Sequence, residues 1–123
     1  MEQRPLISVV DDDESVRESL PDLLGEFGFA VETFASAEEF LASGRVADSR
    51  CLILDIAMPG MSGPDLQREL AQRRQQVPIV FITAHADRSL FPHLIELGAV
   101  ACLLKPFSDT ALRAALDAAL AAT

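Results

Sequence analysis

Three apolar runs in this chain each end in a charged residue, and this pattern constrains the fold more than any other feature. The runs are 6–10, 51–54 and 101–104, and they are followed by Asp11, Asp55 and Lys105. Each run is continuously apolar or nearly so, which is typical of a strand buried on both faces of a parallel sheet. In a doubly wound sheet, ligands bind outside the carboxyl ends of the strands. We therefore expect Asp11, Asp12, Asp55 and Lys105 to converge in one crevice.

This expected crevice would hold more negative than positive charge. Like charges about 4 Å apart repel by about 4 kcal/mol per pair at an effective dielectric constant of about 20. A bound divalent cation would remove that cost, and carboxylate oxygens favour Mg²⁺, or else Mn²⁺, over zinc. The pattern predicts a carboxylate metal site. Taken alone, however, the acidic residues 11–14 are also typical of a solvated turn that caps a helix.

Length and composition indicate one folded domain over residues 1–123, of which 50% are hydrophobic. The apolar runs are too short to span a bilayer and no signal-peptide pattern opens the chain, so we expect a cytoplasmic protein without membrane contact. A net charge of −9 and the absence of Tyr and Trp argue against direct nucleic-acid binding by this segment. Cys51 and Cys102 are expected to be reduced core residues.

Strand-like and helix-like segments alternate along the whole chain. The expected strands are 6–10, 30–34, 51–55, 79–83 and 101–104, and the expected helices are 14–27, 36–43, 62–74, 88–97 and 109–121. Asp13 and Ser108 are expected helix N-caps. Pro21 and Pro92 fall inside expected helices, where proline removes a hydrogen bond. The alternation predicts an α/β, flavodoxin-like fold with a doubly wound five-stranded parallel sheet in the order 2-1-3-4-5 and helices on both faces.

Asp55 is the candidate nucleophile of the predicted site. An aspartate carboxylate can form an acyl phosphate, and a divalent cation can neutralise the incoming phosphoryl oxygens. Thr83 ends the fourth expected strand and can offer a hydroxyl to those oxygens, while Lys105 can offer a positive charge. Pro106 is a candidate cis proline that would aim the lysine. The alternatives are a plain turn role for Asp55 and a structural role for Thr83.

These residues lie in longer motifs that resemble the receiver domain of two-component response regulators. The motifs are Asp11-Asp12, the segment Asp-Ile-Ala-Met-Pro-Gly-Met-Ser-Gly at 55–63, Ile82-Thr83-Ala84 and Lys105-Pro106-Phe107. They follow the order and spacing of the family over essentially the whole chain. Segments 36–41 and 83–87 look most like the FixJ type, in which the receiver precedes a helix-turn-helix DNA-binding domain.

The resemblance implies that Asp55 accepts a phosphoryl group from a sensor histidine kinase, so that the chain is a phosphoacceptor rather than an enzyme. Thr83 and Lys105 would bind the phosphoryl oxygens. The implied Mg²⁺ ligands are the carboxylates of Asp11, Asp12 and Asp55 and the backbone carbonyl of Ala57. Phosphorylation would switch a partner surface, a homodimer through the fourth helix, fifth strand and fifth helix, or a DNA-binding domain outside this chain that controls transcription.

Two positions depart from the family pattern. The residue three before the lysine, which the family leads one to expect as an aromatic that turns inward on phosphorylation, is Cys102. Pro92 falls in the helix that usually rearranges, and we expect it to make that helix less rigid. Signalling should then rely on the 83–87 loop and the 88–97 helix. Ala57 and His85 lie at loop positions that tune the phosphoryl lifetime in this family.

Other classes of protein share parts of the pattern. A haloacid-dehalogenase-type phosphatase also uses an aspartyl phosphate and Mg²⁺, but it needs Asp-x-Asp after the first strand, whereas the acceptor here follows the third. A pseudo-receiver, which is an interaction module without phosphorylation, usually lacks one of the acidic or lysine positions, and all are present here. A single-domain regulator stays open as an alternative, although the last helix has no C-cap glycine, which suggests truncation.

Overall fold

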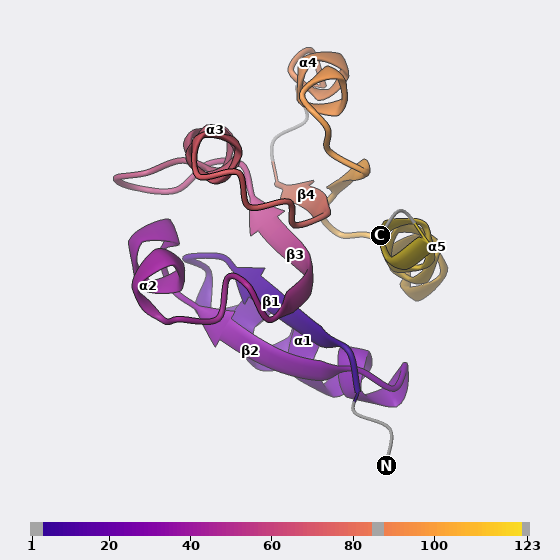
Figure 1. Cartoon of the computed structure of the whole chain (residues 1–123). Helices are drawn as coiled ribbons and strands as arrows, with labels where there is room; N and C mark the ends of the chain where they lie inside the picture. The colour runs from indigo at the N-terminus through magenta and orange to yellow at the C-terminus, as the bar shows by residue number, and fades with distance from the viewer. Residues whose placement is uncertain (1–3, 85–87, 122–123) are drawn as a thin grey trace.

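Five parallel strands form one sheet in the order β2-β1-β3-β4-β5, as the alternating pattern predicts. The structure is a computed structural model that describes residues 4–84 and 88–121 (Figure 1). The strands are β1 (Leu6–Val10), β2 (Ala30–Phe34), β3 (Ser49–Asp55), β4 (Ile79–Thr83) and β5 (Ala101–Leu104). The helices are α1 (Glu14–Glu26), α2 (Ala37–Ala42), α3 (Gly63–Gln72), α4 (Phe91–Glu96) and α5 (Asp109–Ala121).

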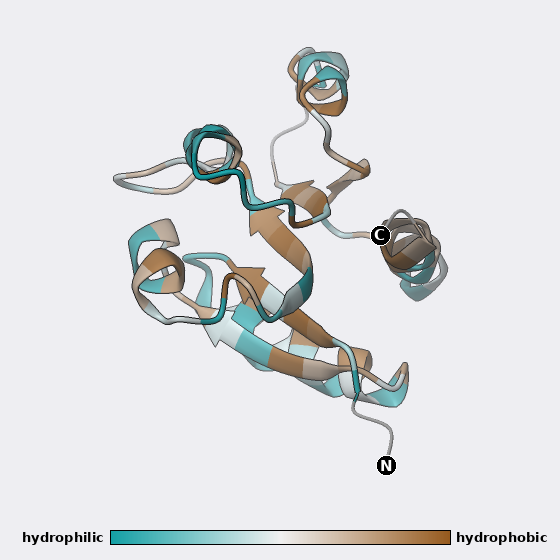
Figure 2. Cartoon of the chain, viewed as in Figure 1, coloured by the Kyte–Doolittle hydropathy of each residue, from teal (hydrophilic) through white to brown (hydrophobic). Residues whose placement is uncertain are grey.

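Helices cover both faces of the sheet, which explains why its central strands are continuously apolar. On one face, α1 and α5 pack against the sheet through Leu20, Leu24, Leu112 and Leu116. On the other face, α2, α3 and α4 contribute Phe40, Leu66, Leu70 and Leu94. Figure 2 shows the hydrophobic colour on the central strands and the hydrophilic colour on outer parts of the helices. Each strand therefore ends between two helical layers.

Helices α1, α2 and α3 begin at side-chain caps in the loops that follow β1, β2 and β3. Asp13 caps α1 as predicted, because its carboxylate accepts a hydrogen bond from the Ser15 backbone N–H at 3.0 Å. Ser36 caps α2 through the Glu39 N–H. Ser62 and Asp65 form a reciprocal capping box at the start of α3. These caps fix where the chain leaves the sheet.

Strand β3 and helix α3 each have a boundary that differs by two residues from the sequence-based expectation. Strand β3 begins at Ser49, two residues before the expected start at residue 51, and the Ser49 hydroxyl hydrogen-bonds the buried Ser8 hydroxyl at 2.6 Å. Helix α3 ends at Gln72, followed by Arg73 as C-cap and by Arg74 in the left-handed region with φ of 56°. Helix α1 continues as one helix through Pro21, and the bend predicted there stays a prediction.

Helix α4 differs most from the expectation. It begins at Phe91 rather than at residue 88, so Pro92 lies in the first turn. A backbone N–H in the first turn has no intrahelical acceptor, and proline loses nothing there. The expectation that Pro92 removes an internal hydrogen bond and loosens this helix is therefore wrong. Residues 85–87, which include His85 and most of the expected 83–87 loop, lie outside the described residues.

Within residues 4–84 and 88–121, no helix combines the length and the apolarity that a membrane span requires.

Candidate functional site at the carboxyl edge of the sheet

The predicted acidic residues do converge at the carboxyl edge of the sheet. Asp11 and Asp12 follow β1, and Asp55 is the last residue of β3, the neighbouring strand. One carboxylate oxygen from each of the three lies within 4.8 Å of the others. Asp11 is fully buried and Asp55 is 6% exposed, whereas Asp12 is exposed to solvent. The cluster is therefore partly desolvated but open on the side of Asp12.

Lys105 supplies a positive charge to this cluster. Its Nζ donates to Asp11 Oδ2 at 2.7 Å, and the lysine side chain is only 16% exposed. Its backbone N–H donates to the Thr83 carbonyl at 2.7 Å, which ties the end of β5 to the end of β4. The Lys105–Pro106 peptide bond is cis, as predicted. Lys105 thus compensates a buried carboxylate of the protein itself.

Asp11 is held from several directions. The Asp13 backbone N–H donates to Asp11 Oδ1 at 2.9 Å, and the Asp11 backbone N–H donates to the Phe34 carbonyl at 3.1 Å. Arg17 Nη1 donates to the Asp11 backbone carbonyl at 2.9 Å. Sequence reasoning missed Arg17, although a basic residue one turn into the helix after an acidic strand end is a signal that could have pointed to it. These contacts fix the orientation of the Asp11 carboxylate.

The pKa of Asp55 is raised to about 7, chiefly by burial and next by the negative charge of Asp11. The Lys105 ammonium and a backbone hydrogen bond from Ala57 oppose part of the rise. Asp55 therefore changes its charge close to neutral pH when only the protein's own groups surround it.

Two glycines shape the loop that follows Asp55. A Cβ atom at Gly63 would lie 2.4 Å from the Asp55 backbone carbonyl oxygen, so only glycine allows α3 to approach this closely. Gly60 has a φ of +73°, and Glu38 Oε2 accepts a hydrogen bond from the next residue, Met61, at 3.2 Å. Sequence reasoning missed Glu38, because no local pattern connects α2 to a loop more than 20 residues away. The loop is thus held from both α2 and α3.

Thr83 and Ala57 occupy the remaining predicted positions. Thr83 is the last residue of β4 and is 1% exposed. In the register of the two strands, Asp55 pairs with Ile82, so Thr83 lies one residue beyond the acceptor position. Ala57 is exposed in the loop after β3. Both residues therefore lie at the same edge of the sheet as the three carboxylates.

The donor set of the cluster fits a hard divalent cation. All three side chains offer carboxylate oxygens, which suit Mg²⁺ or Mn²⁺ better than softer metals. Lys105 compensates only part of their negative charge. The raised pKa of Asp55 has the same origin, since a carboxylate beside another carboxylate in a desolvated site resists ionisation. A cation bound here would relieve this repulsion.

Both cysteines are free thiols, as expected. Cys51 is buried in β3, and burial raises its pKa to about 12. Cys102 pairs with Phe81 in the register of β4 and β5 and is only half-buried. Burial raises its pKa to about 11, so the thiol is neutral at physiological pH. The position three residues before Lys105 thus holds a small neutral side chain.

Comparisons with known proteins agree with this geometry. Residues 7–117 match the family model for the response regulator receiver domain. The chain is 43% identical over 115 residues to the response regulator protein TodT of Pseudomonas putida, covering 94% of this chain and 51% of TodT. It is 42% identical to the transcriptional regulatory protein FixJ of Azorhizobium caulinodans, covering 93% of this chain and 54% of that protein.

A solved structure of a response regulator has the same fold as this chain. The crystal structure of FixJ-N superimposes with a TM-score of 0.87 at 38% identity, covering 99% of this chain and 98% of that one. The chain spans about half the length of the curated relatives that it matches. The resemblance to the FixJ type that the motifs indicate is confirmed.

Proposed function

The chain belongs to the response regulator receiver family, and we propose that Asp55 accepts a phosphoryl group from a sensor histidine kinase. The observation that carries this proposal is the position of Asp55 at the end of β3, nearly buried, with two further carboxylates within 4.8 Å. Lys105 lies in the same cluster through its ion pair with Asp11. This constellation combines a nucleophile, a cation site and a positive charge.

In the proposed reaction, a carboxylate oxygen of Asp55 attacks the phosphorus atom, and the bond to the donor's histidine nitrogen breaks. The attacking carboxylate must be ionised, and a pKa of about 7 leaves a substantial ionised fraction at neutral pH. Lys105 and the hydroxyl of Thr83 would bind the phosphoryl oxygens. The chain acts as acceptor and not as an enzyme in the ordinary sense.

The proposed ligands of Mg²⁺ are the carboxylates of Asp11, Asp12 and Asp55 and the backbone carbonyl of Ala57. When bound, Mg²⁺ would neutralise negative charge on the carboxylates and on the incoming phosphoryl group. Asp11 would keep its orientation through the Asp13 and Lys105 contacts. Asp12 is the exposed ligand, so it lies on the side from which a hydrated cation can enter.

We further propose that phosphorylation acts in the cytoplasm on an output surface formed by α4, β5 and α5. This surface would bind a partner, a second copy of the chain or a DNA-binding domain that controls transcription. Several relatives carry names of transcriptional regulators, and the chain covers about half of their length. Cys102 lies in β5 and cannot provide the inward-turning aromatic of the family. A single-domain regulator is the alternative form of the same proposal.

The test of the acceptor is covalent labelling. Purified protein is incubated with acetyl phosphate and Mg²⁺, and its intact mass is measured. The wild type should gain one phosphoryl group, and Asp55→Asn should gain none. Asp48→Asn is the matched control, because Asp48 is exposed and remote from the cluster in the loop before β3. Equal labelling of Asp55→Asn and wild type would contradict the assignment, whereas no labelling of the wild type would favour a pseudo-receiver.

The test of the output surface is hydrogen exchange with and without beryllofluoride as a mimic of the phosphoryl group. The largest change should fall in peptides that cover 84–97, with little change over 36–43. A change confined to the first two helices would place the output surface elsewhere, even if Asp55 is the acceptor.

A further inference from the structure

The loop between β3 and α3 carries the backbone carbonyl of Ala57, which is a proposed ligand of the cation. Hydrogen bonds between backbone groups hold the two ends of this loop: the Ile56 N–H donates to the Ile82 carbonyl at 3.0 Å, and the Gly63 N–H donates to the Ile56 carbonyl at 3.0 Å. Among the described residues, no backbone–backbone hydrogen bond involves 57–61. The position of this middle part therefore depends on contacts with side chains.

Glu38 reaches the middle of the loop from α2, which lies beside it (Figure 1). Glu38 Oε2 accepts a hydrogen bond from the Met61 N–H at 3.2 Å. A Cβ atom at Gly60 would lie 2.9 Å from the same oxygen, so the carboxylate occupies the space that the glycine leaves open. Gly60 also has a φ of +73°, which favours glycine. The turn at Gly60 thus leaves room for the carboxylate beside the N–H that it accepts from.

The backbone that carries Glu38 is fixed, although its side chain is exposed. Its neighbours Ala37 and Phe40 on α2 are fully buried, and Met58 from the loop packs in the same core cluster. The hydrogen bond from Met61 therefore ties the loop to a helix that is anchored in the core. Because the bond is exposed, its loss should affect the loop much more than the stability of the whole fold.

We propose that Glu38 is a positioning residue for the phosphorylation site, because it holds the loop that carries Ala57. The Ala57 N–H donates to the Asp55 side chain, only four residues before the N–H that Glu38 holds. Glu38 is not one of the three clustered carboxylates, so it acts through the loop and not as a ligand. This inference rests on the proposed function, since it concerns the same site.

The test compares two variants of Glu38 that carry the same charge. Glu38→Ala removes the acceptor, whereas Glu38→Gln keeps a side-chain oxygen at the same reach. A difference between them reports on the hydrogen bond and not on the lost negative charge. Glu39→Ala is the matched control, because Glu39 is the neighbouring exposed carboxylate of α2. The melting temperatures of all three variants in EDTA should stay close to that of the wild type.

The main readout is the dissociation constant of Mg²⁺, measured by NMR titration of the backbone amides without a phosphoryl donor. In Glu38→Ala it should rise about threefold, the effect of losing part of one hydrogen bond. Labelling by acetyl phosphate should slow by a similar factor at limiting Mg²⁺ and recover at saturating Mg²⁺. In EDTA, the Met61 amide should exchange faster in Glu38→Ala alone. Glu38→Gln and Glu39→Ala should match the wild type in each measurement.

The outcomes separate this inference from the proposed function. An unchanged Mg²⁺ affinity in Glu38→Ala, beside a wild type that binds Mg²⁺ and is labelled, would overturn the positioning role and leave the acceptor assignment intact. An equal loss of affinity in Glu38→Gln or Glu39→Ala would trace the effect to charge and would also overturn it. A wild type that neither binds Mg²⁺ nor is labelled would contradict the proposed function, and the role of Glu38 with it.

Discussion

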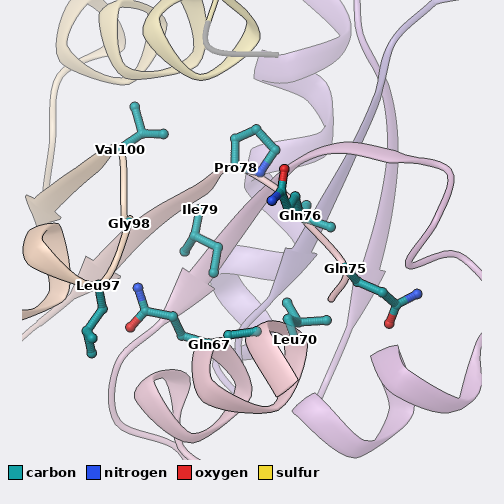
Figure 3. A pocket seen from close by; sticks show the side chains of 11 residues that line it. Gln67, Leu70, Gln75, Gln76, Pro78, Ile79, Leu97, Gly98 and Val100 are labelled. Carbon is teal, nitrogen blue, oxygen red and sulfur yellow. The ribbon is translucent and has the colours of Figure 1, made fainter. Parts of the chain in front are cut away.

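The carboxyl edge of the sheet and one groove at its amino edge carry opposite kinds of surface. At the carboxyl edge, Asp11, Asp12 and Asp55 place three carboxylates within 4.8 Å, and Lys105 pairs with one of them. At the amino edge, a groove lies between α3 and the loops before β4 and β5 (Figure 3), and the described residues that line it are all uncharged. The same sheet therefore carries a site of concentrated charge at one edge and a neutral, largely apolar groove at the other.

The direction of the helices accounts for part of this difference. Because α1, α3 and α5 each follow a strand and run back along the sheet, their N-termini lie at the carboxyl edge. Helix N-termini carry partial positive charge and stabilise anions, whereas C-termini disfavour them. The carboxyl edge can therefore hold carboxylates and a phosphoryl group. The amino edge, with helix C-termini and buried carbonyls, is better suited to neutral donors.

The largest expected effect on stability comes from removing the Lys105 ammonium from the carboxyl edge. Lys105→Met leaves the buried Asp11 carboxylate unpaired, which should lower the free energy of unfolding by about 3 kcal/mol in EDTA. Saturating Mg²⁺ should restore most of that loss by replacing the missing charge. Urea denaturation measures both values.

The control for Lys105→Met is Arg50→Met at the amino edge. Arg50 is exposed and forms no ion pair with the described residues, so its removal should change stability by less than about 0.5 kcal/mol. Equal destabilisation by the two variants would show that the ion pair of Lys105 with Asp11 contributes no more to stability than an exposed arginine.

The next prediction compares a glycine in close contact with the Asp55 loop and a glycine in open space. Gly63→Ala places a methyl group 2.4 Å from the Asp55 carbonyl oxygen, and the resulting shift of the loop should destabilise the fold by about 1–3 kcal/mol. It should also slow labelling by acetyl phosphate. Gly25→Ala, near the end of α1, meets no atom within 4 Å and should stabilise the fold by about 0.5–1 kcal/mol. Urea denaturation should thus show a lower free energy of unfolding for Gly63→Ala and a higher one for Gly25→Ala. Changes of the same sign would contradict the close contact at Gly63.

Metal binding should report on the carboxyl edge alone. Mg²⁺ at ten times its dissociation constant should stabilise the wild type by about 1.4 kcal/mol, seen as a rise in melting temperature. Asp12→Ala should abolish this rise because it removes the exposed ligand. Asp22→Ala, at an exposed position of α1, should keep it. A full Mg²⁺-dependent rise in Asp12→Ala would place the cation elsewhere.

The pKa of Asp55 predicts a pH dependence of the metal-free protein. In the folded state this pKa is about 7, above the ordinary value of 3.8, so between those values the folded state binds more protons than the unfolded state. Stability must therefore fall as pH rises from about 4 to about 7. In EDTA, the wild type should be more stable at pH about 6 than at pH about 8, by about 1 kcal/mol.

The control for this pH effect is Asp55→Asn, which cannot titrate at this position. The difference in its melting temperature between the two pH values should be smaller than that of the wild type. A wild-type profile that rises with pH over this interval, or one that Asp55→Asn leaves unchanged, would show that Asp55 is not the group responsible.

The features that sequence reasoning predicted correctly are those with local causes. Continuous apolar runs predict the strands and their order, and the charged residues that end them predict the convergence of Asp11, Asp55 and Lys105. The cap at Asp13 depends on residues only two positions away. An apolar run or a cap residue depends only on residues that are neighbours in the sequence. Such patterns can therefore be recognised without coordinates.

The missed features depend on packing between distant segments. The contact of Glu38 with Met61, and the groove around Gln67, require the positions of α2, α3 and α4 relative to one another. Nothing in the local pattern encodes them. The error at α4 has another cause: apolar spacing and Gly98 suggest a helix over 88–97, but proline is stable in a first turn. The helix begins at Phe91 because Pro92 can occupy that turn and no later one.

The smallest expected effect follows from this position of Pro92, and its sign distinguishes the two descriptions of α4. With the helix starting at Phe91, Pro92→Ala restores an N–H that has no intrahelical acceptor and adds freedom to the unfolded chain, so stability should fall slightly, by about 0.5 kcal/mol. In a helix starting at residue 88, the same change would restore an internal hydrogen bond and raise stability by more than about 1 kcal/mol. Urea denaturation of the variant beside the wild type measures the sign, and clear stabilisation would return Pro92 to the interior of a longer helix.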